Sequence, residues 1–354
     1  MDEKFWQCFK AVDAQRYIFG TTAEAQVLID IFKDQNIALE AVVDNFYSSD
    51  SFHGLPCIKL IDVPDNAVVI SAVTNSRPID VNQLLKNKGL TYCDYFSFYR
   101  ESGFDCPKID FWEGANSHWE SNQRDYEKVK SWLADDESKH TFDAVVGFRN
   151  NYDLTFMDGF KFDITNMYIE PFILPFEEGS IFFDLGAYDG SDSERFLRHV
   201  NKGCAYLFEP IPEQVEVLQK KYQRSNSVQV VAAAVGSSEK TVYFNVSGTS
   251  SKVVESGDEQ GAVAVQQTYL DKFCKQNELQ PDFIKMDVEG FEVEVLKGME
   301  KLIQQHRPKL AVSVYHRVEH LTQVPIMLKA LCPEYKFYLR HYTQGYSETV
   351  LFAV

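Results

Sequence analysis

The residues best suited to chemistry form a short acidic, glycine-rich turn in the second half of the chain. The turn reads DLGAYDG at residues 184–190 and follows the apolar run IFF at residues 181–183. We expect a helix to begin directly after it, at Ser191. A strand, a glycine-rich turn and a helix in this order hold a nucleotide-like ligand against the helix start in a doubly wound α/β sheet.

The first residue of this turn indicates which ligand it would hold. Asp184 stands at the expected C-terminal edge of the strand, where its carboxylate would repel a phosphate and attract an ammonium group or a hydroxyl. Gly186 would let the backbone approach the ligand closely, and Gly190 would start the helix without an obstructing side chain. These features favour a cofactor that carries an amino acid, S-adenosylmethionine (SAM), over a dinucleotide.

Acids also end two later strand-like runs. Glu209 follows the run at residues 205–208, about 20 residues after the turn, a spacing typical of an acid that bonds a ribose diol. One carboxylate can accept from both ribose hydroxyls. Asp287 and Glu289 follow the run at residues 283–286. Because the C-terminal ends of parallel strands meet at the ligand edge of an open sheet, we expect these acids at that edge.

Four motifs in succession resemble those of a known family. FFDLGAYDGSDSERF, LFEP, AAAVG and IKMDVEGFEVEVLKGM look like the motifs of FkbM-type methyltransferases, which are SAM-dependent O-methyltransferases that act mostly on sugars and polyketides. The DVEGFE segment matches the later family motif in full. The first motif departs from the family pattern, because Tyr188 replaces an asparagine and Asp189 follows. The resemblance covers roughly residues 165–354.

The resemblance implies a cofactor site in the C-terminal part of the chain. Ser193 is expected to reach the methionine carboxylate of SAM, and its alternative role is a helix cap. The two alanines after the third strand are expected near the adenine. The predicted cofactor-binding residues are Asp184, Gly186, Ala187, Tyr188, Asp189, Gly190, Ser193, Glu209, Pro210, Ala233 and Ala234.

The catalytic candidates follow from the chemistry of methyl transfer. The enzyme must align a hydroxyl with the methyl carbon and remove the hydroxyl proton, so a positioned His or carboxylate is wanted. Asp287 and Glu289 are predicted on the acceptor side, with a helix cap as the alternative role for Glu289. His316 is a candidate general base, with a structural role as its alternative. The two acids would also suit Mg²⁺, but no third ligand has convincing spacing, so we predict no metal.

The expected fold is α/β, in two units with a connector. Residues 179–354 are predicted to form the seven-stranded class I SAM-methyltransferase sheet, which is Rossmann-like. Its last two strands pair antiparallel, since the link around Gly345 is too short for a parallel crossover. Residues 1–110 are predicted as a smaller Rossmann-like domain for substrate holding or dimerisation, and residues 111–178 as a helical connector. The turn at Gly20 resembles half of a dinucleotide site, but its glycine pattern is incomplete.

Local patterns give four further expectations. Ser191 and Glu194 are predicted to form a capping box. Residues 291–305 read as one helix, and residues 247–261 as a polar loop or a lid. The aromatic segment at residues 168–172 is expected either to cover the cofactor or to pack in the core.

The composition of the chain limits the kinds of binding partner that we expect. The net charge of −17 disfavours nucleic acids and anionic membranes, and no apolar run reaches the length of a membrane span. The N-terminus lacks signal-peptide features, and the seven scattered cysteines suit reduced thiols in the cytoplasm. We expect a small-molecule or glycan acceptor and consider a homodimer. The alternatives are an NAD(P)-dependent oxidoreductase and a non-catalytic scaffold that binds sugar nucleotides.

Overall fold

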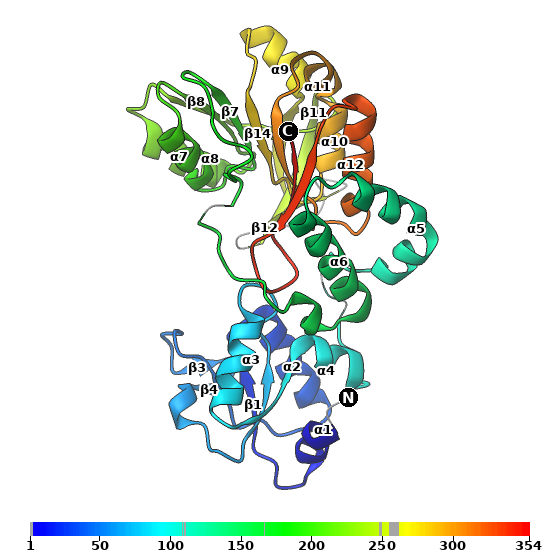
Figure 1. Ribbon diagram of the computed structural model, residues 1–354. Helices are drawn as coiled ribbons and strands as arrows, with labels where there is room; N and C mark the ends of the chain where they lie inside the picture. The colour runs from blue at the N-terminus through cyan, green and yellow to red at the C-terminus, as the bar shows by residue number, and fades with distance from the viewer. Residues whose placement is uncertain (1–2, 108, 110, 166, 248–249, 255–261) are drawn as a thin grey trace. The chain divides into compact units, whose positions relative to one another are not determined.

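The computed structural model describes residues 3–107, 109, 111–165, 167–247, 250–254 and 262–354 (Figure 1). The contacts divide the chain into two compact units. The first unit comprises Met1–Trp119, Phe142–Ile164 and Tyr342–Ser347, and the second Glu120–Thr141, Thr165–His341 and Glu348–Val354. The segment predicted as a connector, residues 111–178, is therefore shared between the two units, and the predicted domain bounds stay a proposal.

The first unit is built on a six-stranded sheet in the order β3-β4-β2-β1-β5-β6. All neighbours in this sheet are parallel except β3 and β4. The strands are β1 (Arg16–Phe19), β2 (Ala41–Val43), β3 (Ser51–Phe52), β4 (Leu55–Ile58), β5 (Val68–Ser71) and β6 (Thr91–Asp94). The helices are α1 (Glu3–Lys10), α2 (Ala23–Asp34), η1 (Leu60–Asp62), α3 (Pro78–Asn87), α4 (Tyr95–Glu101) and, later in the chain, η2 (Leu154–Met157).

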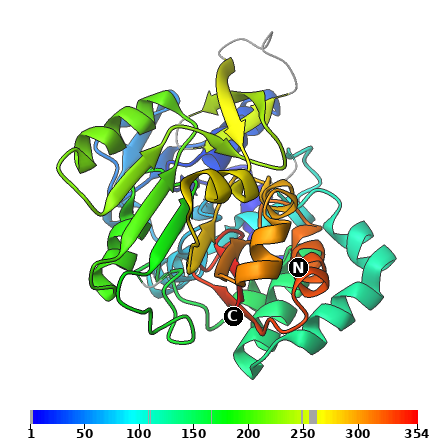
Figure 2. The ribbon, with the colours of Figure 1, turned by 90° about the horizontal axis from the view of Figure 1, so that it is seen from above.

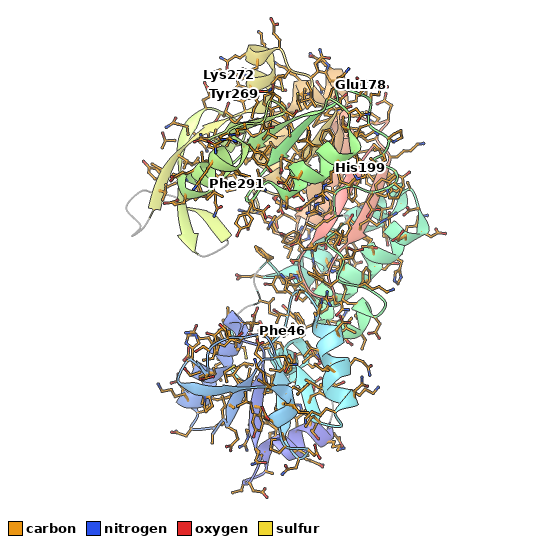
Figure 3. The ribbon with its side chains drawn as sticks, turned by 90° about the vertical axis from the view of Figure 1, so that its left-hand side faces the viewer. Phe46, Glu178, His199, Tyr269, Lys272 and Phe291 are labelled. Atoms are coloured by element: carbon orange, nitrogen blue, oxygen red, sulfur yellow. The ribbon has the colours of Figure 1, made fainter. Side chains whose placement is uncertain are left out.

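In the turn at Gly20, which resembles half of a dinucleotide site, Asp44 accepts hydrogen bonds from the chain itself. The carboxylate of Asp44 accepts hydrogen bonds from the backbone N–H and the hydroxyl of Thr21. It also accepts from the N–H groups of Phe46 and Tyr47. Burial raises the pKa of Asp44, but these hydrogen bonds outweigh it and the pKa is lowered. Asp44 thus closes the turns around it, and Phe46 beside it is exposed (Figure 3).

The second unit contains a seven-stranded sheet in the order β16-β17-β15-β14-β7-β8-β9. Its strands are β7 (Ile181–Leu185), β8 (Cys204–Phe208), β9 (Val228–Val231), β14 (Phe283–Met286), β15 (Lys309–Ser313), β16 (Phe337–His341) and β17 (Thr349–Ala353). The five strands from β9 to β15 are parallel, and β17 runs antiparallel to both β15 and β16. The predicted α/β class is confirmed.

Helices cover both faces of this sheet (Figures 1 and 2). The ring of Phe182 stacks on Phe196 of α7 at 4.9 Å, and the ring of Phe183 meets Phe273 of α9 at 5.9 Å. Successive strand residues point to opposite faces, so α7 and α9 lie on opposite sides. The helices of the second unit are α7 (Ser191–His199), α8 (Pro212–Tyr222), α9 (Leu270–Asn277), α10 (Glu292–Lys297), α11 (Glu300–His306) and α12 (His320–Leu331). Residues of α5 (Ala115–Trp132) and α6 (Asp136–Asn151) are divided between the two units.

A smaller four-stranded sheet has the order β10-β13-β11-β12. Its strands are β10 (Ala234–Val235), β11 (Lys240–Ser247), β12 (Ser250–Val254) and β13 (Ala262–Thr268). The strand expected just before the two predicted alanines is therefore divided between two sheets, with β9 in the large sheet and β10 in this one. The prediction of a loop over residues 247–261 is wrong for β12, and residues 248–249 and 255–261 lie outside the described residues.

Two local predictions about helices are wrong. The helix expected over residues 291–305 is interrupted at Gly298, where a Cβ atom would lie 2.0 Å from the carbonyl oxygen of Gly236. This close approach excludes a side chain. The capping box is also absent from α7, because Gly190 is the N-cap in the left-handed region with no side-chain cap. Glu194 instead pairs with Lys221 at 2.8 Å.

None of the helices in the described residues is both long enough and apolar enough to cross a bilayer. On α9, for example, Tyr269 is the N-cap and Lys272 forms an ion pair with Glu239 (Figure 3).

Candidate active site

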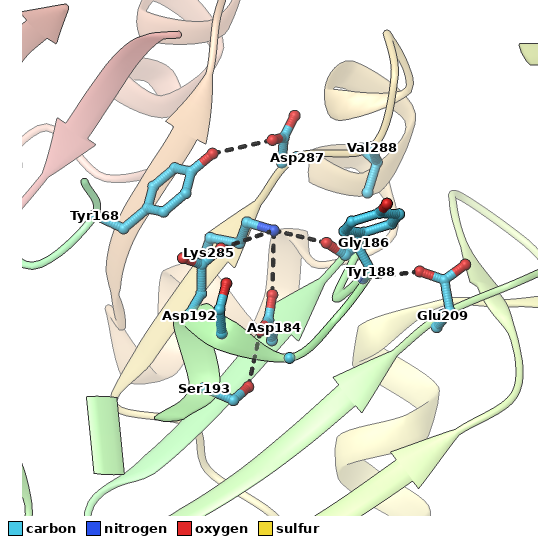
Figure 4. Close-up of polar contacts among 12 residues, drawn as sticks. Tyr168, Asp184, Gly186, Tyr188, Asp192, Ser193, Glu209, Lys285, Asp287 and Val288 are labelled. Carbon is cyan, nitrogen blue, oxygen red and sulfur yellow. Dashed lines mark hydrogen bonds and ion pairs between the residues drawn. The ribbon is translucent and has the colours of Figure 1, made fainter. Parts of the chain in front are cut away.

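A buried ion cluster lies beneath the glycine-rich turn (Figure 4). Lys285 of β14 stands directly opposite Asp184 of β7 in the sheet register. Its Nζ lies 3.2 Å from Asp184 Oδ1 and 3.5 Å from Asp192 Oδ2, and it donates to the carbonyl oxygen of Gly186 at 2.7 Å. Asp184 has no exposed surface and Lys285 is 3% exposed. The cation that meets Asp184 is therefore the ammonium group of the chain's own lysine.

The charges in this cluster depend on one another. Burial lowers the pKa of Lys285, but Asp184 and Asp192 outweigh burial and the net pKa is raised, so the lysine stays charged. Burial raises the pKa of Asp192 to about 6, against the lowering effect of Lys285. The ring of Tyr168 lies 5.4 Å from the Lys285 ammonium, in cation–π geometry.

These contacts describe the surroundings of Asp184 and Ser193. Ser193 is fully buried and its hydroxyl donates to Asp184 Oδ2 at 2.8 Å. Neither residue presents any surface in this structure, and their contact with the methionine part of SAM stays a prediction. Asp184, at the end of β7, is within reach of side chains from its neighbouring strand and from α7. Both residues hold the turn in place from below.

The glycines of the turn are required by geometry. Gly186 has φ of 79°, and a Cβ atom on it would lie 1.9 Å from the carbonyl oxygen of Asp287. Gly190 has φ of 76°, and a Cβ atom on it would lie 2.7 Å from Tyr222 Oη. No other residue type fits either position without moving the backbone or the tyrosine.

Between these glycines, the remaining turn residues differ in exposure. Ala187 is buried, whereas Tyr188 is 47% exposed although its φ is 44°. Asp189 accepts from the backbone N–H of Ser191 at 2.9 Å. Burial raises the pKa of Asp189, but the hydrogen bonds from Ser191 outweigh it and the pKa is lowered. Tyr188 is thus a large side chain that the turn presents to solvent.

Glu209 lies where the sequence predicts it, beside the turn (Figure 4). It is 5% exposed, and its two carboxylate oxygens accept from the N–H groups of Tyr188 at 3.0 Å and Ile211 at 2.9 Å. Burial raises its pKa. Each oxygen keeps further acceptor capacity, as a ribose diol would need. Pro210 follows it and is half-buried.

The two predicted alanines lie just after β9. The N–H of Glu209 donates to the carbonyl oxygen of Val231 at 3.1 Å, which places the end of β9 beside Glu209. Ala233 is half-buried in a bend, and Ala234 begins β10, where it pairs with Gln267. β9 ends at Val231, earlier than expected. Ala233 and Ala234 follow it closely in the chain, and Val231 itself lies beside Glu209.

The three predicted catalytic residues come together at the same edge. His316 follows β15 and is 4% exposed. Its Nε2 lies 3.4 Å from Asp287 Oδ1 and 3.6 Å from Glu289 Oε2. The hydroxyl of Tyr168 donates to Asp287 Oδ2 at 3.0 Å. Tyr168 therefore joins this cluster to the lysine cluster, and its full burial favours the core-packing role over an exposed cover.

A fourth residue of this cluster was not predicted. Glu292 is fully buried at the start of α10, and its Oε1 lies 2.8 Å from His316 Nδ1. The N–H of Val288 donates to the same oxygen at 3.2 Å, and His320 Nδ1 lies 3.1 Å from Oε2. The sequence held a signal for Glu292, because it is the last acid of DVEGFE, but the residue reads there as an ordinary first-turn helix acid.

Glu292 dominates the electrostatics of His316. Burial lowers the pKa of His316, but the charge and hydrogen bond of Glu292, followed by Asp287 and Glu289, raise the pKa to about 9. Burial raises the pKa of Glu292, yet His316 and His320 outweigh it and the net pKa is lowered. Glu292 is therefore a buried carboxylate that keeps its charge because histidines surround it.

Comparisons with known proteins agree with this architecture. Residues 184–341 match the family model described as the methyltransferase FkbM domain. The sheet and its acidic, glycine-rich edge thus define a domain of the methyltransferase class. More specifically, this segment matches the FkbM methyltransferase domain, and the resemblance predicted from the sequence is confirmed over these residues.

One solved structure and one curated relative extend the comparison. The crystal structure of methyltransferase FkbM from Methylobacillus flagellatus KT covers 96% of this chain and 90% of its own, with a TM-score of 0.75 and 22% identity, which shows a shared fold. The hexuronic acid methyltransferase AglP of Haloferax volcanii is 26% identical over 130 residues, or 36% of this chain. The chain matches about half of that relative, 53% of its length. No comparison supports the oxidoreductase or the scaffold.

Proposed function

We propose that the chain is a SAM-dependent O-methyltransferase that methylates a sugar hydroxyl in polysaccharide or glycoconjugate synthesis. The observation that carries the proposal is Glu209, a carboxylate that two backbone N–H groups fix beside the glycine-rich turn of a methyltransferase domain. The name of the curated relative, a hexuronic acid methyltransferase, supports a sugar acceptor.

The residues of the turn and its neighbours fit SAM. The glycine positions leave a bare backbone above Lys285, and Glu209 is the acid suited to the ribose hydroxyls. The backbone of residues 186–190, Tyr188 and Asp189 would hold the amino-acid part, and Pro210, Ala233 and Ala234 the adenine. Asp184 and Ser193 act indirectly, by fixing the turn through Lys285 and through each other. When bound, SAM supplies a methyl group carried on a sulfonium.

The chain's own residues would prepare the acceptor. Asp287, Glu289 and His316 would surround the acceptor hydroxyl, which would give up its proton to a carboxylate oxygen, while His316, with its pKa raised to about 9, would hold the two acids in place rather than act as the base. The Tyr168 hydroxyl holds Asp287 Oδ2 and so leaves Oδ1 facing His316. A hydroxyl aligned in this way needs little reorganisation to react, which is the main contribution an enzyme makes to such a displacement.

The proposal extends to the whole chain. The seven-stranded sheet is the class I SAM-methyltransferase sheet, with a domain at residues 179–354. The domain at residues 1–110 is an appended Rossmann-like domain that holds the acceptor or forms a homodimer, and residues 111–178 connect the two. The enzyme works in the cytoplasm on a small-molecule or glycan acceptor, and its net charge of −17 argues against nucleic acid.

Calorimetry with S-adenosylhomocysteine and NAD tests the cofactor. We expect the first to bind and NAD not to bind. Glu209→Gln should weaken binding roughly 10- to 100-fold, since a hydrogen bond to a charged group contributes about 1.5–3 kcal/mol. Glu213→Gln, at an exposed position of α8, is the matched control and should bind like the wild type. Binding of NAD alone, or binding unaffected by Glu209→Gln, would refute the proposed site.

A second assay tests the reaction. The full chain, SAM and a set of hexuronic-acid-containing and neutral glycans are incubated, and products are weighed by mass spectrometry. A gain of one CH₂ on one acceptor supports the proposal. Binding of SAM with no methylation of any glycan in the set would instead favour a different acceptor class.

A further inference from the structure

One buried carboxylate contacts both the loop that follows β14 and the imidazole that follows β15. Glu292 opens α10 and has no exposed surface. Its Oε1 lies 2.8 Å from His316 Nδ1 and accepts from the backbone N–H groups of Val288 at 3.2 Å and Gly290 at 3.4 Å. Three donors thus converge on one oxygen of a side chain that solvent does not reach.

The two backbone contacts hold the loop on either side of Glu289. Glu289 and Gly290 both lie in the left-handed region, with φ of 52° and 93°. Such a conformation is unfavourable for a residue with a side chain, and it persists only where the surroundings enforce it. The N–H groups of Val288 and Gly290 flank Glu289 and are both bound to Glu292. Glu292 therefore helps to set the direction of the Glu289 side chain.

The imidazole contact sets the charge that faces the two acids. Glu292 can only accept hydrogen bonds while it is charged, so Nδ1 of His316 carries a hydrogen. His316 Nε2 lies 3.4 Å from Asp287 Oδ1 and 3.6 Å from Glu289 Oε2. Burial lowers the pKa of His316, but the three carboxylates, Glu292 first, outweigh burial and raise the pKa to about 9. The ring is therefore a cation among three carboxylates.

Two other rings border this pair. The ring of Tyr315 lies 4.0 Å from that of His316, and burial raises the pKa of Tyr315 well above its usual value, so the phenol stays neutral. On α12, His320 Nδ1 lies 3.1 Å from Glu292 Oε2. Glu292 thus has an imidazole beside each of its oxygens, which holds the carboxylate from both sides.

We propose that Glu292 is a positioning residue for methyl transfer, which fixes the loop around Glu289 and keeps His316 in place as the cation that Asp287 and Glu289 share. Two carboxylates at this spacing stay ionised together only beside a positive charge. An ionised carboxylate is the form that can take the proton of an acceptor hydroxyl. The contacts of Glu292 do not depend on the proposed function, whereas their use in catalysis rests on it.

Nitrogen-15 NMR of the histidine rings in the full chain tests the charge without SAM or an acceptor. In the wild type we expect His316, assigned by comparison with His316→Gln, to lose a ring hydrogen only at about pH 9. Glu292→Gln keeps the size of the side chain and removes its charge. It should bring the midpoint to about pH 8 or below, at least a 10-fold loss of proton affinity. Glu300→Gln, at an exposed position of α11, is the matched control and should leave the midpoint unchanged.

Methyl-transfer kinetics, with an acceptor found by the glycan assay, test the use of this contact. Glu292→Gln should lower kcat about 10- to 100-fold with little change in the KM for SAM, because misplaced groups slow the chemical step. Glu292→Asp keeps the charge on a shorter side chain. It should keep more of the His316 charge than Glu292→Gln does and recover part of kcat.

Three results would overturn the positioning role. They are a neutral His316 at about pH 7 in the wild type, an unchanged His316 midpoint in folded Glu292→Gln, and a wild-type kcat in that variant. The first needs no variant of Glu292, so it decides even if Glu292→Gln does not fold. Absence of both S-adenosylhomocysteine binding and methylation would remove the proposed function and the catalytic role with it, whereas full activity of Glu292→Gln would remove the positioning role alone.

Discussion

Replacing Lys285 by methionine should strongly destabilise the second unit. The ammonium group lies between Asp184 and Asp192 and donates to the Gly186 carbonyl, within a sheet whose strands are buried on both faces. Methionine has nearly the same length and fills the same space. The substitution therefore removes the positive charge and its hydrogen bonds while leaving the packing of the side chain almost unchanged.

The expected loss of unfolding free energy is about 3–5 kcal/mol, as found when one partner of a buried ion pair is removed. The large value comes from Asp184, which has no exposed surface and keeps only Ser193 as a hydrogen-bond donor among its recorded contacts in the described residues. Protonation of Asp192, whose pKa is already raised to about 6, would recover part of the loss. Because of this recovery, we expect the net cost to stay near the lower end of the range.

Urea unfolding followed by circular dichroism measures this loss, with hydrogen exchange assigning it to the second unit. Lys139→Met is the control, because Lys139 pairs with Asp136 on the surface of α6 and such pairs contribute little. The double variant with Asp184→Asn should lose less than the sum of the single variants, by about 1–3 kcal/mol. A cost below about 1 kcal/mol for Lys285→Met, or no coupling in the double variant, would refute this account of the cluster.

Three further outcomes are expected. Gly186→Ala should abolish S-adenosylhomocysteine binding or folding, whereas Gly179→Ala, at similar φ but with open space around it, should cost only about 1–2 kcal/mol in urea unfolding; equal effects would contradict the close approach. The Asp192 carboxyl has a folded pKa of about 6, above the roughly 3.9 of an unfolded aspartate. Its contribution to stability is therefore present below pH ~4 and is lost as the pH rises through about 6; carbon-13 NMR should show the titration, and Asp192→Asn should remove this pH dependence. The Asp135 carboxyl, paired with Arg340, has its pKa lowered to about 2, because the Arg340 hydrogen bond outweighs burial. Its contribution is present above pH ~4 and is lost as the pH falls through about 2, with a size reduced by partial exposure; acid unfolding of Asp135→Asn should begin at a higher pH than that of the wild type.

The sequence predicted the elements that carry the site because local signals delimit them. The apolar runs at residues 181–183 and 205–208 lie within β7 and β8, since each is followed by an acid and a turn signal. Pro212 begins α8, a position where the missing N–H and fixed φ of proline suit a helix start. Placing acids at strand ends was enough to bring Asp287, Glu289 and His316 to one edge, because parallel strands share that edge.

The partners of these residues could not be predicted in the same way. Lys285 sits inside a run that reads as apolar, and only the strand register places it opposite Asp184. Glu292 acts through His316, which is remote in the sequence. Gly298 interrupts a regular helical pattern because the backbone of Gly236 passes beside it. Each of these depends on a contact between distant segments, which composition and periodicity do not encode.

The cluster around Lys285 and the cluster around His316 both bring carboxylates close together, and they differ in the positive charge that balances those carboxylates. The edge gathers Asp184, Asp192, Asp287 and Glu289 near one another, and such a group of carboxylates cannot stay charged without positive partners. Lys285 and Arg195 give the buried pair two fixed positive charges, since Lys285 lies between Asp184 and Asp192 and Arg195 pairs with Asp192 at 2.7 Å. The outer pair faces His316, whose pKa is raised to about 9, so its positive partner is an imidazole ring whose charge depends on one exchangeable proton. An exchangeable charge is what a site needs if it is to bind and release an acceptor, whereas a permanent one suits a scaffold.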